Sequence, residues 1–150
     1  MRTTLAVLIG CALVLPTLAQ AGPNDEIKYR KAMIGGMARN AMGIRDIIKG
    51  DLDHKTELKN LGEALAISAR LSKDAFRVNT AGKGTEHSTV KGDLIWKQWP
   101  DFSKRMDKLA LDASAVALAS SKNDVAATGD ALKTVFSNCK GCHETYRDEK

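Results

Sequence analysis

The sequence predicts an all-α protein, an antiparallel up-down-up-down four-helix bundle with its chemically active residues in the last dozen positions. Apolar residues recur at helical spacings of three and four along most of the chain, and strand-like alternation persists nowhere. Aromatic residues make up only 5% of the 150 residues. A core with so few rings must be built from Leu, Ile, Met and Ala, which suits packed helices.

The first helix is predicted to begin at Asn24 or Asp25, either of which can serve as an N-cap, and to end at Gly50. Its apolar stripe comprises Ile27, Met33, Ile34, Met37, Ala41, Ile44, Ile47 and Ile48. Gly35 and Gly36 interrupt the helix and cost it roughly 2 kcal/mol relative to two alanines. These glycines either permit the close approach of another group or leave the helix locally loose.

Three further helices are predicted downstream, with a long connection between the second and the third. The second carries Leu58, Leu61, Leu65, Ser68 or Ala69, and Leu71 on its apolar face. Residues 79–92 lack an apolar period and contain several glycines, so they are predicted to form a loop. The third helix starts at Pro100 and buries Phe102, Met106, Leu109, Ala113 and Val116. The fourth is capped by Asn123 and turns Val125, Leu132, Val135, Phe136 and Cys139 inward.

Residues 1–21 have the features of a signal peptide that is removed on export. Arg2 precedes an apolar run from Leu5 to Leu15, and Ala19-Gln20-Ala21 has the small-x-small pattern of a signal peptidase site. The apolar run is short for a bilayer span, so we expect no stable membrane insertion, although a retained anchor is the alternative. Cys11 lies in a weaker, lipoprotein-like cleavage box and is expected to be removed with the peptide.

Residues 22–150 are predicted to form a single domain, because about 129 residues suffice for one core and not for two. The formal net charge of the full chain is +5, and acidic and basic residues are interspersed throughout. No dense basic run with interleaved aromatic residues occurs, so the sequence gives no support to nucleic-acid binding.

Cys139, Cys142 and His143 form a C-x-x-C-H motif near the end of the fourth predicted helix. On a helix, Cys142 lies one turn after Cys139, and so does His143, so all three can face one flank. Two thiols at this spacing can add to the two vinyl groups of a haem, while the adjacent imidazole ligates the iron. C-x-x-C-H is typical of c-type haem attachment.

Two other chemistries fit the motif less well. A structural zinc site needs four ligands, usually as two separated pairs, and this chain offers one pair. A redox-active thiol pair usually lies at a helix N-terminus beside a βαβ unit, and neither feature is predicted here. A disulfide or a metal site therefore stays the alternative to covalent haem.

The chain resembles the class II cytochromes c, and cytochrome c′ in particular, along the whole segment after the signal peptide. The resemblance rests on residues 139–143 followed by Arg147, and on the stretch Lys28-Tyr29-Arg30-Lys31 of the first helix. It implies one covalently attached haem c held between the helices, with His143 as the proximal iron ligand and the first helix over the distal face. It also implies a periplasmic location and a homodimer packed through the first helices.

The resemblance gives roles to several residues around the haem. Arg30 occupies the family position that pairs with a haem propionate. Lys31 is a second candidate for such a contact, although this chain departs from the family pattern there, which often has glutamine. Arg147 lies one helical turn after His143 and either flanks the proximal haem face or is a solvated cation at a helix end. A cation on that face would favour the reduced iron.

The distal position decides between two functions. In this family that position lies four residues after Arg30 and holds Ile34, whereas low-spin relatives place a ligating methionine there. Isoleucine cannot ligate, which favours a high-spin, five-coordinate haem with an apolar distal site open to NO and CO. Met33 and Met37 are expected to pack in the haem pocket. If either reached the iron, the protein would be a low-spin electron carrier.

The sequence thus predicts a haem protein with gaseous ligands and redox partner proteins, able to transfer electrons. It does not predict an enzyme, because no acid–base pair accompanies the haem motif. No catalytic residue is assigned.

Overall fold

A computed structural model describes residues 21–148, and four long helices dominate this part of the chain. They are α1 (Pro23–Lys49), α2 (Glu57–Ser72), α4 (Trp99–Ser121) and α5 (Val125–Tyr146). Two short elements, η1 (Asp74–Phe76) and α3 (Leu94–Lys97), lie in the connection between α2 and α4. None of the helices in residues 21–148 is both long and apolar enough to span a membrane. The predicted signal peptide, with Cys11, falls almost entirely in residues 1–20, outside the described residues.

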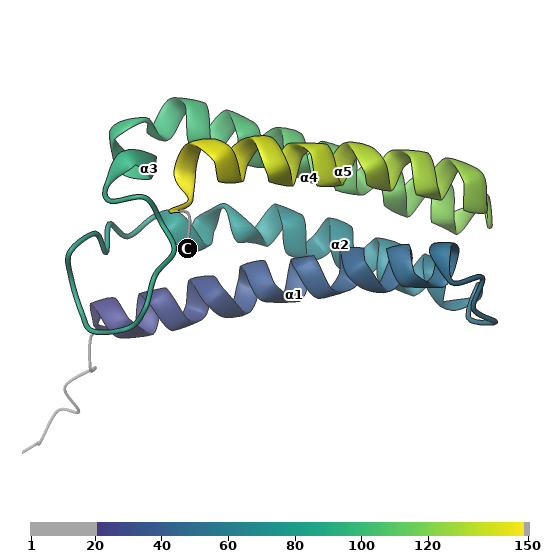
Figure 1. Cartoon of the computed structure of the whole chain (residues 1–150), viewed down its shortest axis with the longest axis horizontal. Coiled ribbons are helices and arrows are strands. Elements are labelled where there is room, and N and C mark those ends of the chain that lie inside the picture. Colours follow the sequence, from purple (N-terminus) through teal and green to yellow (C-terminus); the bar gives the residue numbers. More distant parts are fainter. Residues whose placement is uncertain (1–20, 149–150) are drawn as a thin grey trace, which may run out of the picture.

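The four long helices run alternately up and down, as predicted (Figure 1). Each packs against the next one along the chain, so that α1 lies on α2, α2 on α4, and α4 on α5. Much less contact joins α1 to α5, which closes the fourth side of the bundle. The bundle is therefore tight on three sides and loosely closed on the fourth.

The core consists largely of the apolar faces predicted from periodicity. All five residues predicted for the inner face of α4 are buried: Phe102, Met106, Leu109, Ala113 and Val116. The ring of Phe102 lies edge-on to the rings of Phe76 and Tyr146, at centroid distances of 4.8 and 5.3 Å. Leu71 was predicted to be on the inner face of α2, and it is half exposed.

Two predicted helix caps are displaced. Asp124 caps α5, since its carboxylate accepts from the backbone N–H of Ala127 at 2.9 Å, whereas Asn123 precedes the cap with a φ of 56°. At the start of α1 the N-cap is Gly22, and the Asp25 carboxylate accepts from its N–H. The predicted end of α1 at Gly50 is confirmed, because Gly50 is the C-cap.

Close approach of two helices is required at Gly62 of α2. A Cβ atom on this residue would lie 2.3 Å from Ser120 Oγ and 3.2 Å from the Cα of Ala117, both on α4. The added carbon would overlap with Ser120 Oγ and would be unusually close to the Cα of Ala117, so α2 and α4 can lie this close because residue 62 lacks a side chain.

The loop between η1 and α3 connects the start of α1 to the end of α5 (Figure 1). On one side the Asn24 side-chain oxygen accepts from the backbone N–H groups of Thr85 and Glu86, at 2.8 and 3.0 Å. On the other side an isolated β-bridge pairs Val90 with Arg147. Its hydrogen bonds run from Lys91 N–H to the Tyr146 carbonyl and from Asp148 N–H to the Thr89 carbonyl, each at 2.9 Å. The loop is thus fixed to both helices at this end.

Candidate functional site

A cavity of about 780 Å³ lies between α1 and α5, on the loosely closed side of the bundle. Its α1 wall is formed by Ile34, Met37, Ala38, Ala41 and Met42. Its α5 wall is formed by Val135, Phe136, Cys139, Lys140, His143 and Glu144, and Leu65, Arg147 and Asp148 complete the lining. The volume is within the range of small-molecule and cofactor sites, and the α1 wall is wholly apolar.

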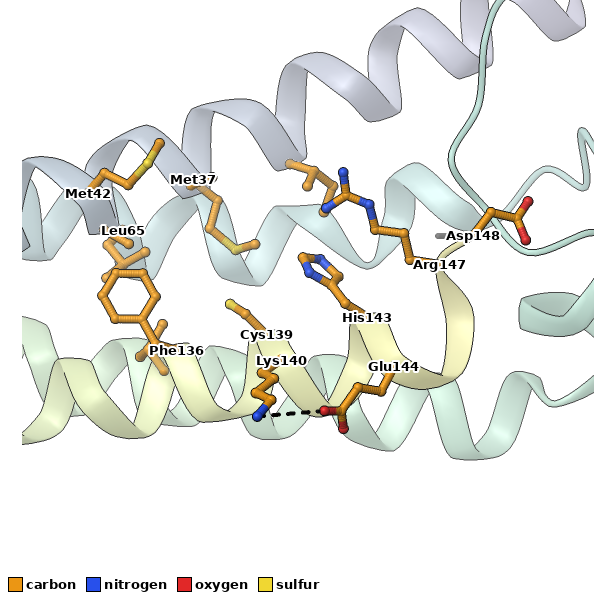
Figure 2. Close-up of a pocket in the computed structure, with 14 residues that line it drawn as sticks. Met37, Met42, Leu65, Phe136, Cys139, Lys140, His143, Glu144, Arg147 and Asp148 are labelled. Carbon is orange, nitrogen blue, oxygen red and sulfur yellow. Dashed lines mark ion pairs between the residues drawn. The ribbon is translucent and has the colours of Figure 1, made fainter. Parts of the chain in front are cut away.

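Two of the three motif residues face this cavity. Cys139 and His143 point from α5 towards α1, and Met37 extends from α1 towards them (Figure 2). Cys142 is not among the residues that line the cavity, although it packs against the core. Its nearest charges include Arg105 of α4. We expected all three motif residues on one flank of the helix. In the structure only Cys139 and His143 share a flank, and Cys142 is turned towards α4.

The two thiols are free in this structure and lack the surroundings of a reactive thiol pair. Burial raises the pKa of Cys139 and of Cys142 above the ordinary value, and for Cys142 the nearby Arg105 opposes part of the rise. Both residues lie in the last two turns of α5, where the helix dipole disfavours a thiolate. Among residues 21–148 no group of three or more His, Cys, Asp or Glu side chains could hold a metal ion.

His143 is in a form suited to metal ligation. Its pKa is lowered, first by partial burial and then by the positive charge of Arg147. The side chain is nevertheless accessible to solvent, because it faces the cavity. Figure 2 shows the Arg147 side chain extending back over the imidazole. The ring is therefore mainly neutral at neutral pH, and a neutral imidazole nitrogen is the form that binds a metal.

The α1 wall contains two of the three distal residues singled out in the sequence. Ile34 and Met37 line the cavity, whereas Met33 does not, because it lies one residue, or about 100°, around the helix. Met37 is only 6% exposed and belongs to the core cluster. Its sulfur lies 3.9 Å from the Ser72 hydroxyl of α2, and that hydroxyl donates to the Ser68 carbonyl at 2.6 Å.

Arg30 is engaged elsewhere. Its guanidinium donates to the carbonyls of Ala75 and Val78 and to the Thr80 hydroxyl, at 3.1 to 3.2 Å. It also lies over the rings of Phe76 and Trp96, at 4.9 and 5.3 Å from their centroids. These contacts bury the side chain and lower its pKa through desolvation, and Arg30 is not among the residues that line the cavity.

Lys31 is also outside the cavity lining and forms an ion pair with Glu86 of the loop, at 3.5 Å. In this structure both cations hold the 75–86 segment against α1. The predicted propionate contacts of Arg30 and Lys31 are thus not visible in the side-chain arrangement and stay predictions.

Several lining residues were missed in the sequence. Met42 and Leu65 were missed because a single stripe does not reveal which apolar residues line a void and which fill the core. Met42 could have been found from its position eight residues after Ile34, two helical turns along the same face. Lys140 and Glu144 form an ion pair at 3.8 Å, and they place charged groups on the α5 side of the cavity (Figure 2).

Comparison with known proteins identifies the family. The family model for cytochrome C′ matches residues 25–147, nearly all of the described chain. The chain belongs to the cytochrome c′ family. Among its relatives, cytochrome c′ of Pararhodospirillum photometricum is 33% identical over 128 residues, covering 85% of this chain and 100% of the relative. Cytochrome c-556 of Agrobacterium fabrum is 30% identical over 148 residues, covering 98% and 94%.

Solved structures agree with the fold. Ferric cytochrome c prime from Alcaligenes xylosoxidans superposes with a TM-score of 0.76 at 24% sequence identity, covering 87% of this chain and 98% of that one. Cytochrome c prime from Shewanella frigidimarina superposes with a TM-score of 0.75 at 23% identity, covering 85% and 97%. The four-helix bundle of this chain is thus the cytochrome c′ fold.

Members of the cytochrome c′ family carry covalent haem c, and the site of this chain suits that cofactor. A largely apolar cavity accommodates a macrocycle, while Cys139 and His143 offer it a thiol and a neutral imidazole from one helix. Cys142 packs against the core and is not among the residues that line the cavity.

Proposed function

We propose that the protein is a periplasmic haem c protein with a five-coordinate iron that binds small gases and can transfer electrons. Cys139 and Cys142 form the thioether bonds, and His143 is the proximal ligand. The observation that carries this proposal is the shared cavity of Cys139 and His143, which opens onto an apolar wall of α1 in a chain of the cytochrome c′ family. Bound haem supplies an iron that takes NO or CO and exchanges single electrons.

The residues of the α1 wall determine which ligands the site accepts. Ile34, Ala38 and Ala41 offer neither a ligand atom nor a hydrogen-bond donor, so they disfavour water and anions and leave room for small neutral molecules. A variant of cytochrome c prime from Alcaligenes xylosoxidans has been solved with bound NO, which supports gas binding by this chain.

Met37 is the residue on which the alternative, a low-spin electron carrier, depends. Its thioether is a possible sixth ligand. In the structure Met37 lines the cavity but is nearly buried in the core cluster, so ligation would require it to leave that packing. We therefore assign Met37 to pocket packing and Ile34 to the distal face. Arg147, placed over His143, is assigned to the proximal side, where its charge favours the reduced iron.

The experiment is expression in a bacterium with c-type haem maturation, followed by optical spectroscopy of the purified protein. We expect a covalent haem that resists acid–acetone extraction, a high-spin ferric spectrum, and CO binding by the reduced protein. The Cys139→Ser/Cys142→Ser double variant should lose covalent haem, whereas Ser137→Ala, a matched change on the exposed side of α5, should retain it.

A low-spin ferric spectrum with a sulfur–iron band in the wild type would contradict the five-coordinate assignment. Disappearance of that band in Met37→Leu would then identify Met37 as the ligand. Retention of the high-spin spectrum in Met37→Leu is the result expected from our proposal.

Location and assembly are separate parts of the proposal. Residues 1–21 direct export, so fractionation should place the mature protein in the periplasm and N-terminal sequencing should begin near Gly22. We also propose a homodimer packed through the first helices. The exposed ring of Tyr29 on α1 supports such packing. Sedimentation equilibrium of the haem-loaded protein tests it, and a monomer at high micromolar concentration would contradict it.

A further inference from the structure

An ion pair on α4 lies against the segment of α5 that carries the haem motif. Arg105 Nε donates to the Asp101 carboxylate at 2.7 Å, and Arg105 Nη1 donates to the carbonyl of Gly141 at 3.3 Å. Gly141 stands between the two cysteines of the motif and directly precedes Cys142. One end of the attachment segment is thus bonded to a charged group from a neighbouring helix.

The other end of the segment is held by the same ion pair. The hydroxyl of Tyr146 donates to the Asp101 carboxylate at 2.7 Å and lies 3.3 Å from the side-chain oxygen of Gln98. Tyr146 is only 3% exposed, its ring packs on Phe102, and the Arg105 guanidinium lies 5.8 Å from its centroid. In the sequence, Cys142 and His143 therefore lie between two residues, 141 and 146, that are both hydrogen-bonded to the Asp101–Arg105 pair.

This arrangement differs from most ion pairs within single helices of the described chain, although Asp112 of the Lys108–Asp112 pair on α4 also accepts from Asn138 of α5. Lys133 and Asp130 of α5, for example, are both largely exposed, and the Lys133 ammonium donates to Asp130 itself. Exposed pairs of that kind contribute little. The Asp101–Arg105 pair instead bonds to a buried phenol and to a backbone carbonyl of another helix, which gives it a fixed position beside the motif.

We propose that the Asp101–Arg105 pair of α4, fixed on α5 through Gly141 and Tyr146, positions the haem-attachment turn and tunes the reduction potential of the haem. The inference rests on the proposed function. The two charges of the Asp101–Arg105 pair shift the reduction potential in opposite directions. A cation near a haem favours the reduced, less positive iron, and an anion favours the oxidised iron. Arg105 raises the potential, Asp101 lowers it, and the pair keeps the local field nearly neutral.

The test is potentiometric titration of haem-loaded variants at low ionic strength. Arg105→Gln leaves the Asp101 charge uncompensated and should shift the equilibrium towards the oxidised iron by about threefold, roughly 28 mV at 59 mV per tenfold. Asp101→Asn should shift it by a similar factor in the opposite direction. The double variant should return near the wild-type potential, and all shifts should shrink in high salt.

Two further variants separate charge from position. Tyr146→Phe keeps all charges and the ring packing, so its potential should stay near that of the wild type, while amide hydrogen exchange at residues 145–148 should quicken. Lys133→Gln removes one cation from a pair on α5 away from the motif and should leave the potential unchanged.

The outcomes distinguish this inference from the proposed function. The inference alone would be overturned if the potentials of haem-loaded Arg105→Gln and Asp101→Asn moved in the same direction. It would also be overturned if they moved no further than the potential of Lys133→Gln. A purely structural contact would give such parallel shifts. A wild-type protein without covalent haem would overturn the inference and the proposed function together.

Discussion

The two long sides of this bundle are built differently. Where α2 meets α4, the absence of a side chain at Gly62 brings the helices so close that an added Cβ would overlap with Ser120. Where α1 faces α5, the helices enclose a cavity of about 780 Å³, and no atom lies within 4 Å of the Cβ position of Gly36. Glycine thus permits close packing of α2 against α4 on one side. On the other side, Gly36 lies in α1, whose inner surface forms one wall of the cavity.

Gly62→Ala tests the close packing of α2 against α4. The added methyl group would overlap with Ser120 Oγ, which can rotate, and would press on the Cα of Ala117, which cannot. We expect the free energy of unfolding to fall by about 2 kcal/mol, as for other overpacked core positions. Urea denaturation of the wild type and the variant measures the change, and an unchanged midpoint would show that α2 and α4 are not in close contact.

Removal of the haem should affect the two sides unequally. If the proposed haem occupies the cavity, the haem-free Cys139→Ser/Cys142→Ser variant lacks its contacts on the α1–α5 side, while the α2–α4 interface keeps its contacts. We expect amide hydrogen exchange to quicken at least about tenfold around Ala38 and Ala41, and much less around Ala66 and Ala113. Exchange measured residue by residue by NMR tests this, and equal acceleration on both sides would mean that the cavity is not the cofactor site.

Gly36→Ala should have the opposite sign to Gly62→Ala. An alanine here meets no atom of the chain and removes the conformational freedom of a mid-helix glycine, so it should stabilise the haem-free protein by about 1 kcal/mol. The measurement is thermal or urea unfolding of haem-free and haem-loaded protein. A gain in the first and a loss in the second would show that the haem or a second subunit approaches Gly36.

The last prediction concerns alkaline pH. Burial and the hydrogen bond to Asp101 raise the pKa of Tyr146 to about 12, and Gln98, Arg105 and Cys142 also lie near it. An unfolded tyrosine titrates near 10, so the native state favours the neutral phenol. Its contribution is complete below pH 10 and is lost as pH rises towards 12.

The control for this titration is Tyr146→Phe. Lysines titrate in the same range, so the relevant quantity is the difference in unfolding free energy between the wild type and the variant as a function of pH. That difference should shrink between pH 10 and 12, and a difference independent of pH would contradict the raised pKa.

Much of the architecture was predictable because helix faces follow from periodicity. All five residues predicted for the inner face of α4 are buried, although the buried Ser120 was not predicted. The motif was placed in the last turns of the last long helix. The short helix α3 was missed, since four residues show no period. Asn123 and Asp124 are both good capping residues, so the cap could be placed only to within one position.

The site was less predictable, because its contacts join segments distant in sequence. The spacing of Cys139 and His143 predicted that they lie on one face of the last helix. The family resemblance led us to expect Ile34 and Met37 on the wall opposite them. Spacing could not show that Arg30 bonds to residues 45 to 50 positions away, or that Cys142 turns towards α4. Such contacts depend on loop conformation and on how two helices are rotated about their axes.

The loop at one end of the bundle also limits the width of the site. Glu86 is bonded to Asn24 at the start of α1, and Thr89 is bonded to Asp148 just after α5. Three residues of extended chain span at most roughly 10 Å. At this end the length of the connecting chain therefore sets an upper limit on the separation of α1 from α5. Adding a residue between His87 and Ser88 would lengthen that limit, so the loop is the place where this fold can change the distance between the two walls without altering either helix.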